Sequence, residues 1–393
     1  MVDGQLAGNL NNLNLWRSKP RLLVLIGLYV VCTSAAAAVL PEERGDILYH
    51  SYEGGGVKID GPSVLLRKNF GDSVSAGINH YVDNVSSASI DVVVSASEYT
   101  EHREENSISL DYLRDKTTMS VGYTRSVESD FDATTISLNI SQDMFGDLTT
   151  VSMGFAQGDN IVGKNGSPNF DEAAKVRSYR ISVSQIFTTN LIMAFALETI
   201  TDQGYLNNPY RSVRFFDATS ATQFSFQDEV YPTTRTSNAV AVRANYYLQQ
   251  RAALHAGYRL FGDSWGIDAS TIELGYTLPY GKEWIFETSL RFYEQGKADF
   301  YSDLFPFQNA QNFLARDKEL SSFTSTTIGF GANYEFDNKD WNKIKRGSLN
   351  LNLDLIYFDY EDFRDLTKTA AVGNEPLYSF EATVIRVFSS IWF

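Results

Sequence analysis

The chain has 393 residues, of which 43% are hydrophobic and 13% aromatic, and its mean hydropathy is −0.22. This composition excludes a disordered or collagen-like chain, and the negative mean hydropathy excludes a membrane protein built of helices. The formal charge is −15, from 33 basic and 48 acidic residues. Because a chain without excess positive charge cannot displace counterions from a phosphate backbone, we expect no nucleic-acid partner.

The N-terminal segment has the layout of a secretory signal peptide. An apolar run at 22–32 follows a basic stretch, and the small residues at 35–38 offer a cleavage site. The basic residues are Arg17, Lys19 and Arg21. We expect residues 1–37 to be removed on export and residues 38–393 to form a single domain.

Cys32 is the only cysteine of the sequence. Its position in the apolar run raises the alternative of a lipoprotein, but a lipid-attachment site needs a small residue before the cysteine, and Val30 and Val31 are bulky. Cleavage leaves a mature chain without cysteine. Such a chain suits an oxidising compartment and excludes thiol catalysis and cysteine-based metal sites.

From about residue 45 onward, apolar side chains recur at every second position. The clearest case is the series Leu349, Leu351, Leu353 and Leu355 with polar residues between. Such alternation is typical of strands with one apolar and one polar face. Several segments keep the pattern over about 10 residues, which a tilted membrane strand needs, whereas strands of soluble sandwiches usually have about 5 to 6. The length therefore favours a membrane barrel.

The connections between these segments alternate in length, as they do in outer-membrane barrels. Short turns are expected at 71–72, 115–116, 144–147, 188–190, 249–250 and 280–282, with a longer one at 337–346. Upper connections are expected at 54–56, 83–102, 127–131, 158–173, 201–234, 262–264, 295–318 and 361–376.

Both termini of such a barrel lie on the side of the short turns, so the number of strands is even. A first strand at 46–53 brings the number to sixteen. We predict an all-β fold, a transmembrane antiparallel up-and-down β-barrel of about sixteen strands. It has long aromatic-rich extracellular loops and lies in the bacterial outer membrane.

The last strand, at about 377–393, ends in the aromatic residue Phe393. A terminal aromatic on an alternating final strand is the form that the barrel-insertion machinery recognises. We therefore predict that Phe393 is an assembly signal and that this machinery is a partner.

If the apolar positions face lipid, the alternate positions face the lumen. The charged residues and the histidine among them are Arg180, Glu198, Arg243, His255, Arg259, Glu273, Glu287, Arg291, Glu335, Asp354 and Arg386. Opposite charges on neighbouring strands attract one another. One interpretation is a selectivity zone that sorts ions or small polar solutes. The other is mutual neutralisation, which stiffens the wall and partly fills the interior, and sixteen strands leave room for both.

The upper loops suggest two further interactions. Their excess of acidic residues could hold divalent ions that bridge anionic lipopolysaccharide, although solvated loops are the simpler interpretation. The two longest loops, 201–234 and 295–318, are rich in Phe and Tyr. These aromatic residues either pack on each other as a lid, fold into the lumen as a constriction, or bind a ligand or partner.

The sequence lacks the common signatures of catalysis. Its four histidines are far apart, and it has no nucleophile elbow, zinc-protease motif or phosphate loop. His102 lies among Glu101, Glu104 and Glu105, but one histidine in an exposed acidic run is usually solvated. We expect no enzymatic activity, no cofactor and no metal.

The segment 86–97 (SSASIDVVVSAS), followed by 99–103 (YTEHR) and by 121–123 (VGY), resembles a bacterial family of predicted outer-membrane barrels. The domain of that family is named only as of unknown function, and the likeness extends over most of the mature chain. In that family, the genes tend to lie beside those of a thioredoxin-like protein, a flavin transferase and a small lipoprotein. The resemblance implies an envelope redox or export context and supplies no catalytic residues.

Two functions remain open. The first is a channel, or an export or uptake pore, for a small polar or peptide-like solute, which the lumen charges support. The second is an outer-membrane anchor for periplasmic redox partners, such as the thioredoxin-like protein and the small lipoprotein. For the second, the turn 337–346 offers a partner-binding surface. Its candidate residues are Trp341, Lys343, Lys345 and Arg346.

Overall fold

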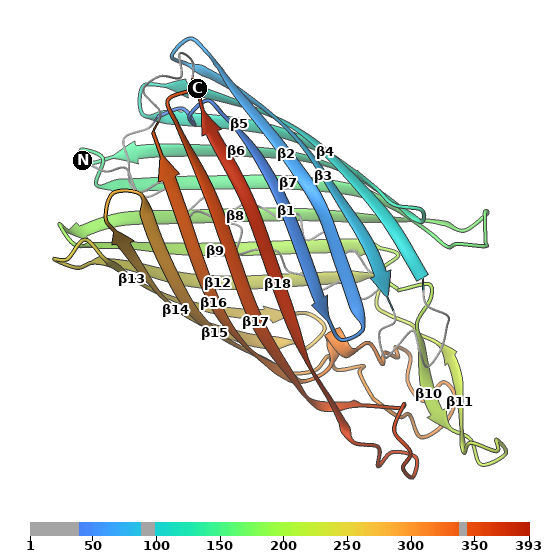
Figure 1. Ribbon diagram of the computed structural model, residues 1–393. Coiled ribbons are helices and arrows are strands. Elements are labelled where there is room, and N and C mark those ends of the chain that lie inside the picture. Colours follow the sequence, from blue (N-terminus) through green and yellow to red (C-terminus); the bar gives the residue numbers. More distant parts are fainter. Residues whose placement is uncertain (1–38, 88–98, 338–343) are drawn as a thin grey trace.

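The computed structural model describes residues 39–87, 99–337 and 344–393, and within them sixteen strands close into one antiparallel barrel (Figure 1). The barrel strands are β1 (Arg44–Gly54), β2 (Val57–Phe70), β3 (Val74–Ser87), β4 (Tyr99–Arg114), β5 (Thr117–Val127), β6 (Phe131–Met144), β7 (Thr149–Gly163), β8 (Asp171–Thr188), β9 (Leu191–Gly204), β12 (Thr234–Tyr247), β13 (Ala253–Asp263), β14 (Asp268–Tyr280), β15 (Trp284–Gln295), β16 (Phe323–Phe336), β17 (Arg346–Arg364) and β18 (Leu377–Trp392). A separate hairpin consists of β10 (Ser212–Phe216) and β11 (Phe224–Asp228), and a short 3₁₀ helix, η1, spans Lys318–Leu320. The predicted all-β barrel with sixteen strands is confirmed.

Strands that follow one another in the barrel pair with each other, and β9 pairs with β12 across the hairpin. The barrel closes where β1 pairs with β18, from Arg44 opposite Trp392 to Gly54 opposite Ala382. Among the described residues, no helix is long and apolar enough to cross a membrane.

The two ends of the barrel differ in their connections (Figure 1). Short turns and both ends of the described chain lie at one end, and the long loops lie at the other, here called the outer end. The tight turns after β2 and β14 use Gly71 and Gly281, whose φ angles of 66° and 68° favour glycine. The predicted alternation of short and long connections is therefore confirmed.

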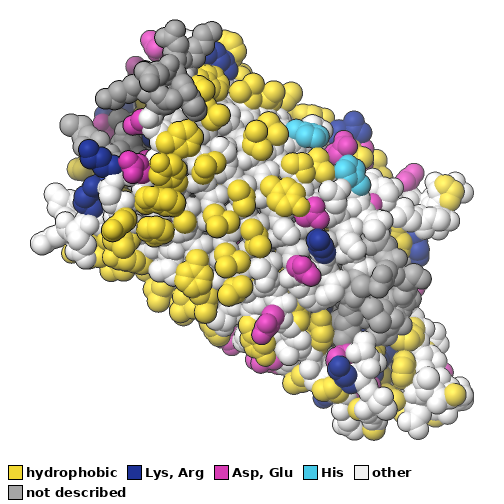
Figure 2. Space-filling model, viewed as in Figure 1, with side chains coloured by type: hydrophobic (Ala, Val, Ile, Leu, Met, Phe, Trp, Pro, Cys, Tyr) yellow, Lys and Arg dark blue, Asp and Glu magenta, His cyan; other side chains and the backbone are white. Residues whose placement is uncertain are grey.

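A belt of apolar side chains covers the outer surface of the barrel (Figure 2). It includes Leu66, Leu110, Leu138, Ile181, Leu290 and Leu351, all of them exposed. Beyond the belt, charged and histidine side chains appear on the surface (Figure 2). On β4 and β5 the exposed side chains of Glu104, His102 and Arg125 are of this kind. Soluble proteins rarely expose so large a continuous apolar surface, so the belt faces lipid.

Several predicted loop bounds are wrong, because pairing continues beyond the apolar belt. Instead of a connection at 83–102, β3 runs to Ser87 and β4 begins at Tyr99. Likewise β7 and β8 extend into the predicted loop 158–173. In these extensions both faces carry polar residues, so the alternation that marks a membrane strand ends before the backbone pairing does.

Three loops at the outer end pack together, and we call them the cap. They are residues 205–233 with the hairpin, residues 296–322 with η1, and residues 365–376. The main apolar cluster of the protein joins cap residues such as Tyr231 and Phe300 to residues of the inner wall such as Tyr52 and Phe358. The outer part of the barrel interior is therefore a packed core on the side where the cap meets the wall.

Candidate functional site in the lumen

The pairing register identifies the residues on the inner wall. In β17, Leu351 and Leu355 belong to the exposed belt, so Asn352 and Asp354 face inward, and cross-strand partners share their face. By this rule all the following candidates lie on the inner wall: Arg180, Glu198, Arg243, His255, Arg259, Glu273, Glu287, Arg291, Glu335, Asp354 and Arg386.

The inner wall from β8 to β15 carries charged side chains that remain partly exposed. Glu198 receives two arginines, with Arg180 Nη2 3.2 Å from its Oε1 and Arg259 Nη2 3.5 Å from its Oε2. Between β14 and β15, Arg291 Nε lies 3.3 Å from Glu273 Oε1. The side chains of Arg259, Arg291 and Glu273 keep 40%, 39% and 44% of their accessible surface, whereas Arg180 and Glu198 keep 16%. We call this the exposed sector.

Aromatic rings hold the arginines of the exposed sector against the wall. The guanidinium of Arg259 lies 5.4 Å from the ring centre of Phe261, and that of Arg291 lies 5.7 Å from Tyr293. Each ring lies two residues along the same strand and therefore on the same face. Such stacking orients a guanidinium while leaving its edge available for hydrogen bonds.

His255 lies in the same part of the wall, but its two ring nitrogens have partners. Nδ1 lies 2.9 Å from Asn245 Oδ1 and Nε2 lies 2.9 Å from Thr277 Oγ1. The Thr277 hydroxyl is also 3.5 Å from Glu287 Oε1, which links the two candidates. This chain of hydrogen bonds gives His255 a structural part in the wall.

On the opposite side of the lumen, from β17 to β4, several charges are paired, and the side chains of these pairs are only 1–26% exposed. Arg386 forms an ion pair with Asp354. Arg103 binds Asp83, with Nη1 3.2 Å from Oδ2, and also binds Glu105. We call this the buried sector, whose further members are His50, Arg67 and Asp111.

His50 is the most buried member of this sector, with 1% of its surface exposed. Its Nε2 lies 2.8 Å from Asp83 Oδ1 and 3.1 Å from the Tyr81 hydroxyl, and its ring stacks on Tyr81. His50, Asp83 and Arg103 were not among the predicted lumen residues, and Asp83 fell within the predicted loop 83–102. The parity of Ile108 and Leu110, continued back along β4, places Arg103 and Glu105 on the inner face and was the signal that could have revealed these two.

The two sectors correspond to the two interpretations of the lumen charges. In the buried sector the opposite charges neutralise each other and tie neighbouring strands together. In the exposed sector, Arg259, Arg291 and Glu273 are paired but still accessible, so a solute can meet their charges. The geometry therefore supports selectivity only on the side from β8 to β15.

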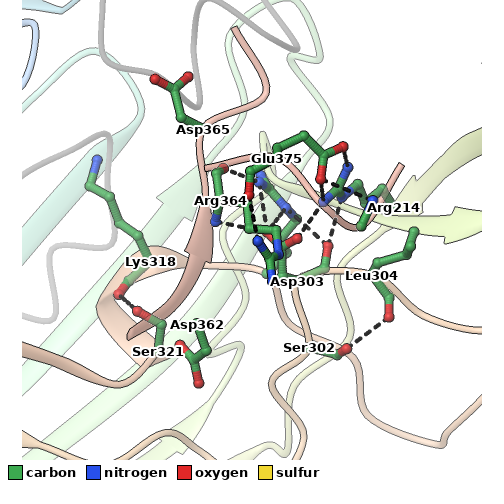
Figure 3. Close-up of polar contacts among 12 residues, drawn as sticks. Arg214, Ser302, Asp303, Leu304, Lys318, Ser321, Asp362, Arg364, Asp365 and Glu375 are labelled. Carbon is green, nitrogen blue, oxygen red and sulfur yellow. Dashed lines mark hydrogen bonds and ion pairs between the residues drawn. The ribbon is translucent and has the colours of Figure 1, made fainter. Parts of the chain in front are cut away.

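Charged residues also fasten the cap (Figure 3). Arg214, in the middle of β10, is fully buried and binds Glu375 of the last loop and Asp303 of the loop before it. Arg316 Nη2 lies 3.0 Å from Asp303 Oδ1 and also donates to the Arg364 carbonyl, and the Arg364 guanidinium donates to the Glu375 carbonyl. Desolvation by burial raises the pKa of Glu375, but its hydrogen bonds and ion pair with Arg214 lower the pKa by more. The pKa of Glu375 is therefore lower than its ordinary value.

The aromatic residues of the cap pack against each other and against the wall. Tyr231, Trp265 and Phe300 form a triangle with ring centres 5.2–5.5 Å apart. A smaller cluster joins the hairpin to the neighbouring loop through Phe215 and Phe305. Of the three alternatives for these residues, this arrangement matches the lid, with part of it folded into the mouth of the barrel.

The remaining candidates lie at the short-turn end. Trp341 and Lys343 lie outside the described residues. Lys345 is exposed, and Arg346 pairs with Glu42 at 2.5 Å and stacks on Trp392 at 4.4 Å. The backbone N–H of Phe393 donates to the Glu43 carbonyl at 3.4 Å, and Lys68 Nζ lies 5.5 Å from its ring centre.

The predicted signal peptide, residues 1–37, also lies outside the described residues. Within the described part of the chain, no group of three or more His, Cys, Asp or Glu side chains is arranged to hold a metal ion.

A closed antiparallel barrel with an apolar outer belt, a polar inner wall and loops of unequal length at its two ends defines a transmembrane β-barrel of the outer-membrane type. The chain belongs to the family described as protein of unknown function DUF3570, whose model matches residues 95–175 and 167–348. No curated protein matches the sequence.

Three solved structures have a similar fold, and the chain spans less than two thirds of the first of them. The siderophore receptor PirA from Pseudomonas aeruginosa has 12% identity and a TM-score of 0.40, and the match covers 90% of this chain and 63% of that one. A bacterial polysaccharide outer membrane secretin has 6% identity and a TM-score of 0.46, and the match covers 90% of this chain and 99% of the secretin chain. The anion-selective porin from Comamonas acidovorans has 10% identity and a TM-score of 0.41, and the match covers 89% of this chain and 99% of the porin chain.

Proposed function

We propose that the protein is an outer-membrane channel for small polar or peptide-like solutes. The observation that carries the proposal is the exposed sector, where Arg259, Arg291 and Glu273 keep about two fifths of their surface accessible. Charges that served only to stiffen the wall would be buried, as they are in the buried sector. A charge left accessible inside a barrel acts on whatever passes it.

The arrangement of the exposed sector favours solutes that carry both signs of charge. Arginine and glutamate pair across neighbouring strands of this sector, Arg180 with Glu198 and Arg291 with Glu273. A solute with a carboxylate and an ammonium group, such as a short peptide, can meet an opposite charge at both of its ends. A simple anion or cation meets one attractive and one repulsive neighbour.

Planar-bilayer recording tests the channel directly. The variant Arg259→Ser/Arg291→Ser removes two positive charges from the exposed sector, so the cation preference should rise, most strongly at low salt where screening is weak. Arg251→Ser serves as the matched control, since Arg251 is exposed in the turn between β12 and β13. An unchanged reversal potential in a conducting, folded variant would contradict selectivity by this sector.

The same recording separates the channel from the anchor for periplasmic partners. A correctly folded barrel that carries no current under any salt or voltage condition would favour the anchor. Binding of a thioredoxin-like protein or a small lipoprotein to the purified barrel would then be the next measurement.

A further inference from the structure

Glycines of the inner wall lie beneath polar side chains from neighbouring strands. The five in question are Gly154, Gly257, Gly275, Gly329 and Gly331. None of them has a φ angle in the left-handed region, so their backbone conformations do not require glycine. Glycine weakens a strand relative to alanine. The glycines at these positions therefore need another explanation. A polar side chain from a neighbouring strand occupies the space above each of them.

Gly257 of β13 lies between two candidates of the exposed sector. It pairs with Arg243 on β12 and with Glu273 on β14. A Cβ atom at Gly257 would lie 3.5 Å from Glu273 Cβ and Oε2, and 3.8 Å from Arg243 Cγ. Both charged side chains thus lie along the wall, over the backbone of Gly257, in the volume that a larger residue would fill.

The pattern recurs at Gly329 and Gly331 of β16. A Cβ atom at Gly331 would lie 2.8 Å from Asn352 Oδ1 and 3.2 Å from Glu287 Cβ. One at Gly329 would overlap the Ser289 hydroxyl and lie 2.7 Å from Asp354 Oδ1. Here even alanine would displace a polar group of the wall.

Two more strands show the same relationship. A Cβ atom at Gly275 would lie 3.4 Å from Cβ of His255 and 3.5 Å from its ring Cδ2. At Gly154 it would lie 2.6 Å from Asn139 Oδ1 and 3.9 Å from Arg180 Cβ. Six of the candidate lumen residues therefore have a glycine beside them on a neighbouring strand, and they are Arg180, Arg243, His255, Glu273, Glu287 and Asp354.

We infer that these glycines are positioning residues that determine the width and the charge pattern of the lumen. Each lets a charged or polar side chain lie flat on the wall, which keeps the interior wide and fixes where the charge is presented. At Gly257 and Gly275 a Cβ atom would make ordinary contacts, but a β-branched side chain such as valine would push its neighbour toward the barrel axis, where the same charge narrows the path. The expected effect on transport rests on the proposed channel function. The displacement of the side chain is independent of that function.

The test compares two valine substitutions one residue apart on β13. Gly257→Val adds bulk beneath Glu273 and Arg243, whereas Ala256→Val adds bulk on the exposed lipid face of the same strand. Folding is checked by heat-modifiable gel mobility. Gly257→Val should reduce single-channel conductance and shift the reversal potential, and Ala256→Val should change neither. Equal conductance and reversal potential in the two folded variants would overturn the inference.

A rescue experiment excludes a general disturbance of the strand. Removing the displaced side chain in Gly257→Val/Glu273→Ala should restore conductance beyond that of Gly257→Val alone, because valine then fills space that Glu273 has vacated. A double variant that conducts no better than Gly257→Val would overturn the positioning role.

Thiol labelling tests the displacement without relying on current. In a chain in which Cys32→Ser has removed the only native cysteine, Glu273→Cys is labelled with a water-soluble thiol reagent. The labelling rate should rise when Gly257→Val is added and should stay the same when Ala256→Val is added. Equal rates in both backgrounds would overturn the glycine inference. A barrel without current but with the expected labelling would overturn only the proposed channel.

Discussion

Arg214 and Glu375 are 161 residues apart in the sequence and form a two-pronged ion pair, with Nη1–Oε1 and Nη2–Oε2 distances of 2.6 Å and 3.1 Å. Arg214 lies in the middle of β10, the first strand of the hairpin, and Glu375 lies in the loop that leads into the last strand. Because the Arg214 side chain is fully buried, the pair excludes water and fixes the two loops relative to each other. The cap is thus fastened by charges as well as by its aromatic core.

Replacing Arg214 should loosen the cap without unfolding the barrel. Arg214→Met leaves the buried Glu375 carboxylate without its main partner, and breaking such a pair costs about 3–5 kcal/mol. We expect faster proteolysis and hydrogen exchange in residues 205–233 and 365–376, with barrel stability unchanged. Lys368→Met, an exposed position in the same loop, is the control. Equal protection of the loops in both variants would show that the pair does not hold the cap.

The stability of the cap should depend on pH through Glu229. Its carboxylate accepts hydrogen bonds from the Tyr231 hydroxyl at 2.6 Å and from the Arg316 backbone N–H at 2.7 Å. Burial, reinforced by the nearby Asp317, raises the pKa of Glu229 from 4.5 to about 7, although Arg211 opposes the shift. The protonated form is therefore favoured in the folded cap.

For an acid whose folded-state pKa is raised, the stabilisation is complete below the unfolded pKa and is lost as the pH rises through the folded pKa. Opening of the cap, measured by hydrogen exchange, should accordingly increase between about pH 4.5 and pH 7. Glu229→Gln should flatten this dependence, since glutamine has no proton to lose. A variant with the same pH profile as the wild type would exclude Glu229 as its source.

The two sectors of the inner wall should respond differently to loss of an arginine. Arg386→Met leaves Asp354, whose side chain is only 20% exposed, without its arginine and should lower barrel stability by about 1–3 kcal/mol, seen as a lower transition temperature of gel mobility. Arg259→Ser, in the exposed sector, should alter ion selectivity and cost little stability, because an accessible ion pair contributes little. If both variants lose stability equally, the distinction between the sectors is wrong.

The barrel could be predicted because alternation is a local property of the sequence. The leucines of β17 from Leu349 to Leu355 reveal both a strand and its lipid face, and the same parity assigns Arg243 or Glu287 to the inner wall. Of the buried sector, Arg386 and Asp354 were predicted in this way, but Arg103 and Glu105 were missed where the apolar belt stops, since they alternate with other polar residues. The cap was foreseen only as aromatic loops, because the contact of Arg214 with Glu375 depends on the closure of the barrel.

Deleting Phe393 should slow insertion of the barrel while leaving export intact. The terminal aromatic is the proposed recognition element, and in the folded protein its ring lies near Lys68 while its N–H binds the Glu43 carbonyl. Lys68→Ala is the control, because it removes the ring contact of the folded state and keeps the aromatic residue itself. Surface levels that fall in Lys68→Ala as far as in the deletion would assign the effect to folded stability.

A charge placed on either face of β6 should distinguish lipid from lumen. Leu138 and Asn139 are adjacent and both exposed, but Leu138 belongs to the apolar belt, and Asn139 faces inward opposite Gly154. Leu138→Arg places a guanidinium in the hydrocarbon, which near the middle of the membrane costs about 2–4 kcal/mol. Asn139→Arg places the same group toward the interior, where water or a neighbouring carboxylate can receive it. We expect a lower transition temperature of gel mobility for Leu138→Arg alone, and the reverse order would mean that the two faces of the barrel are assigned the wrong way round.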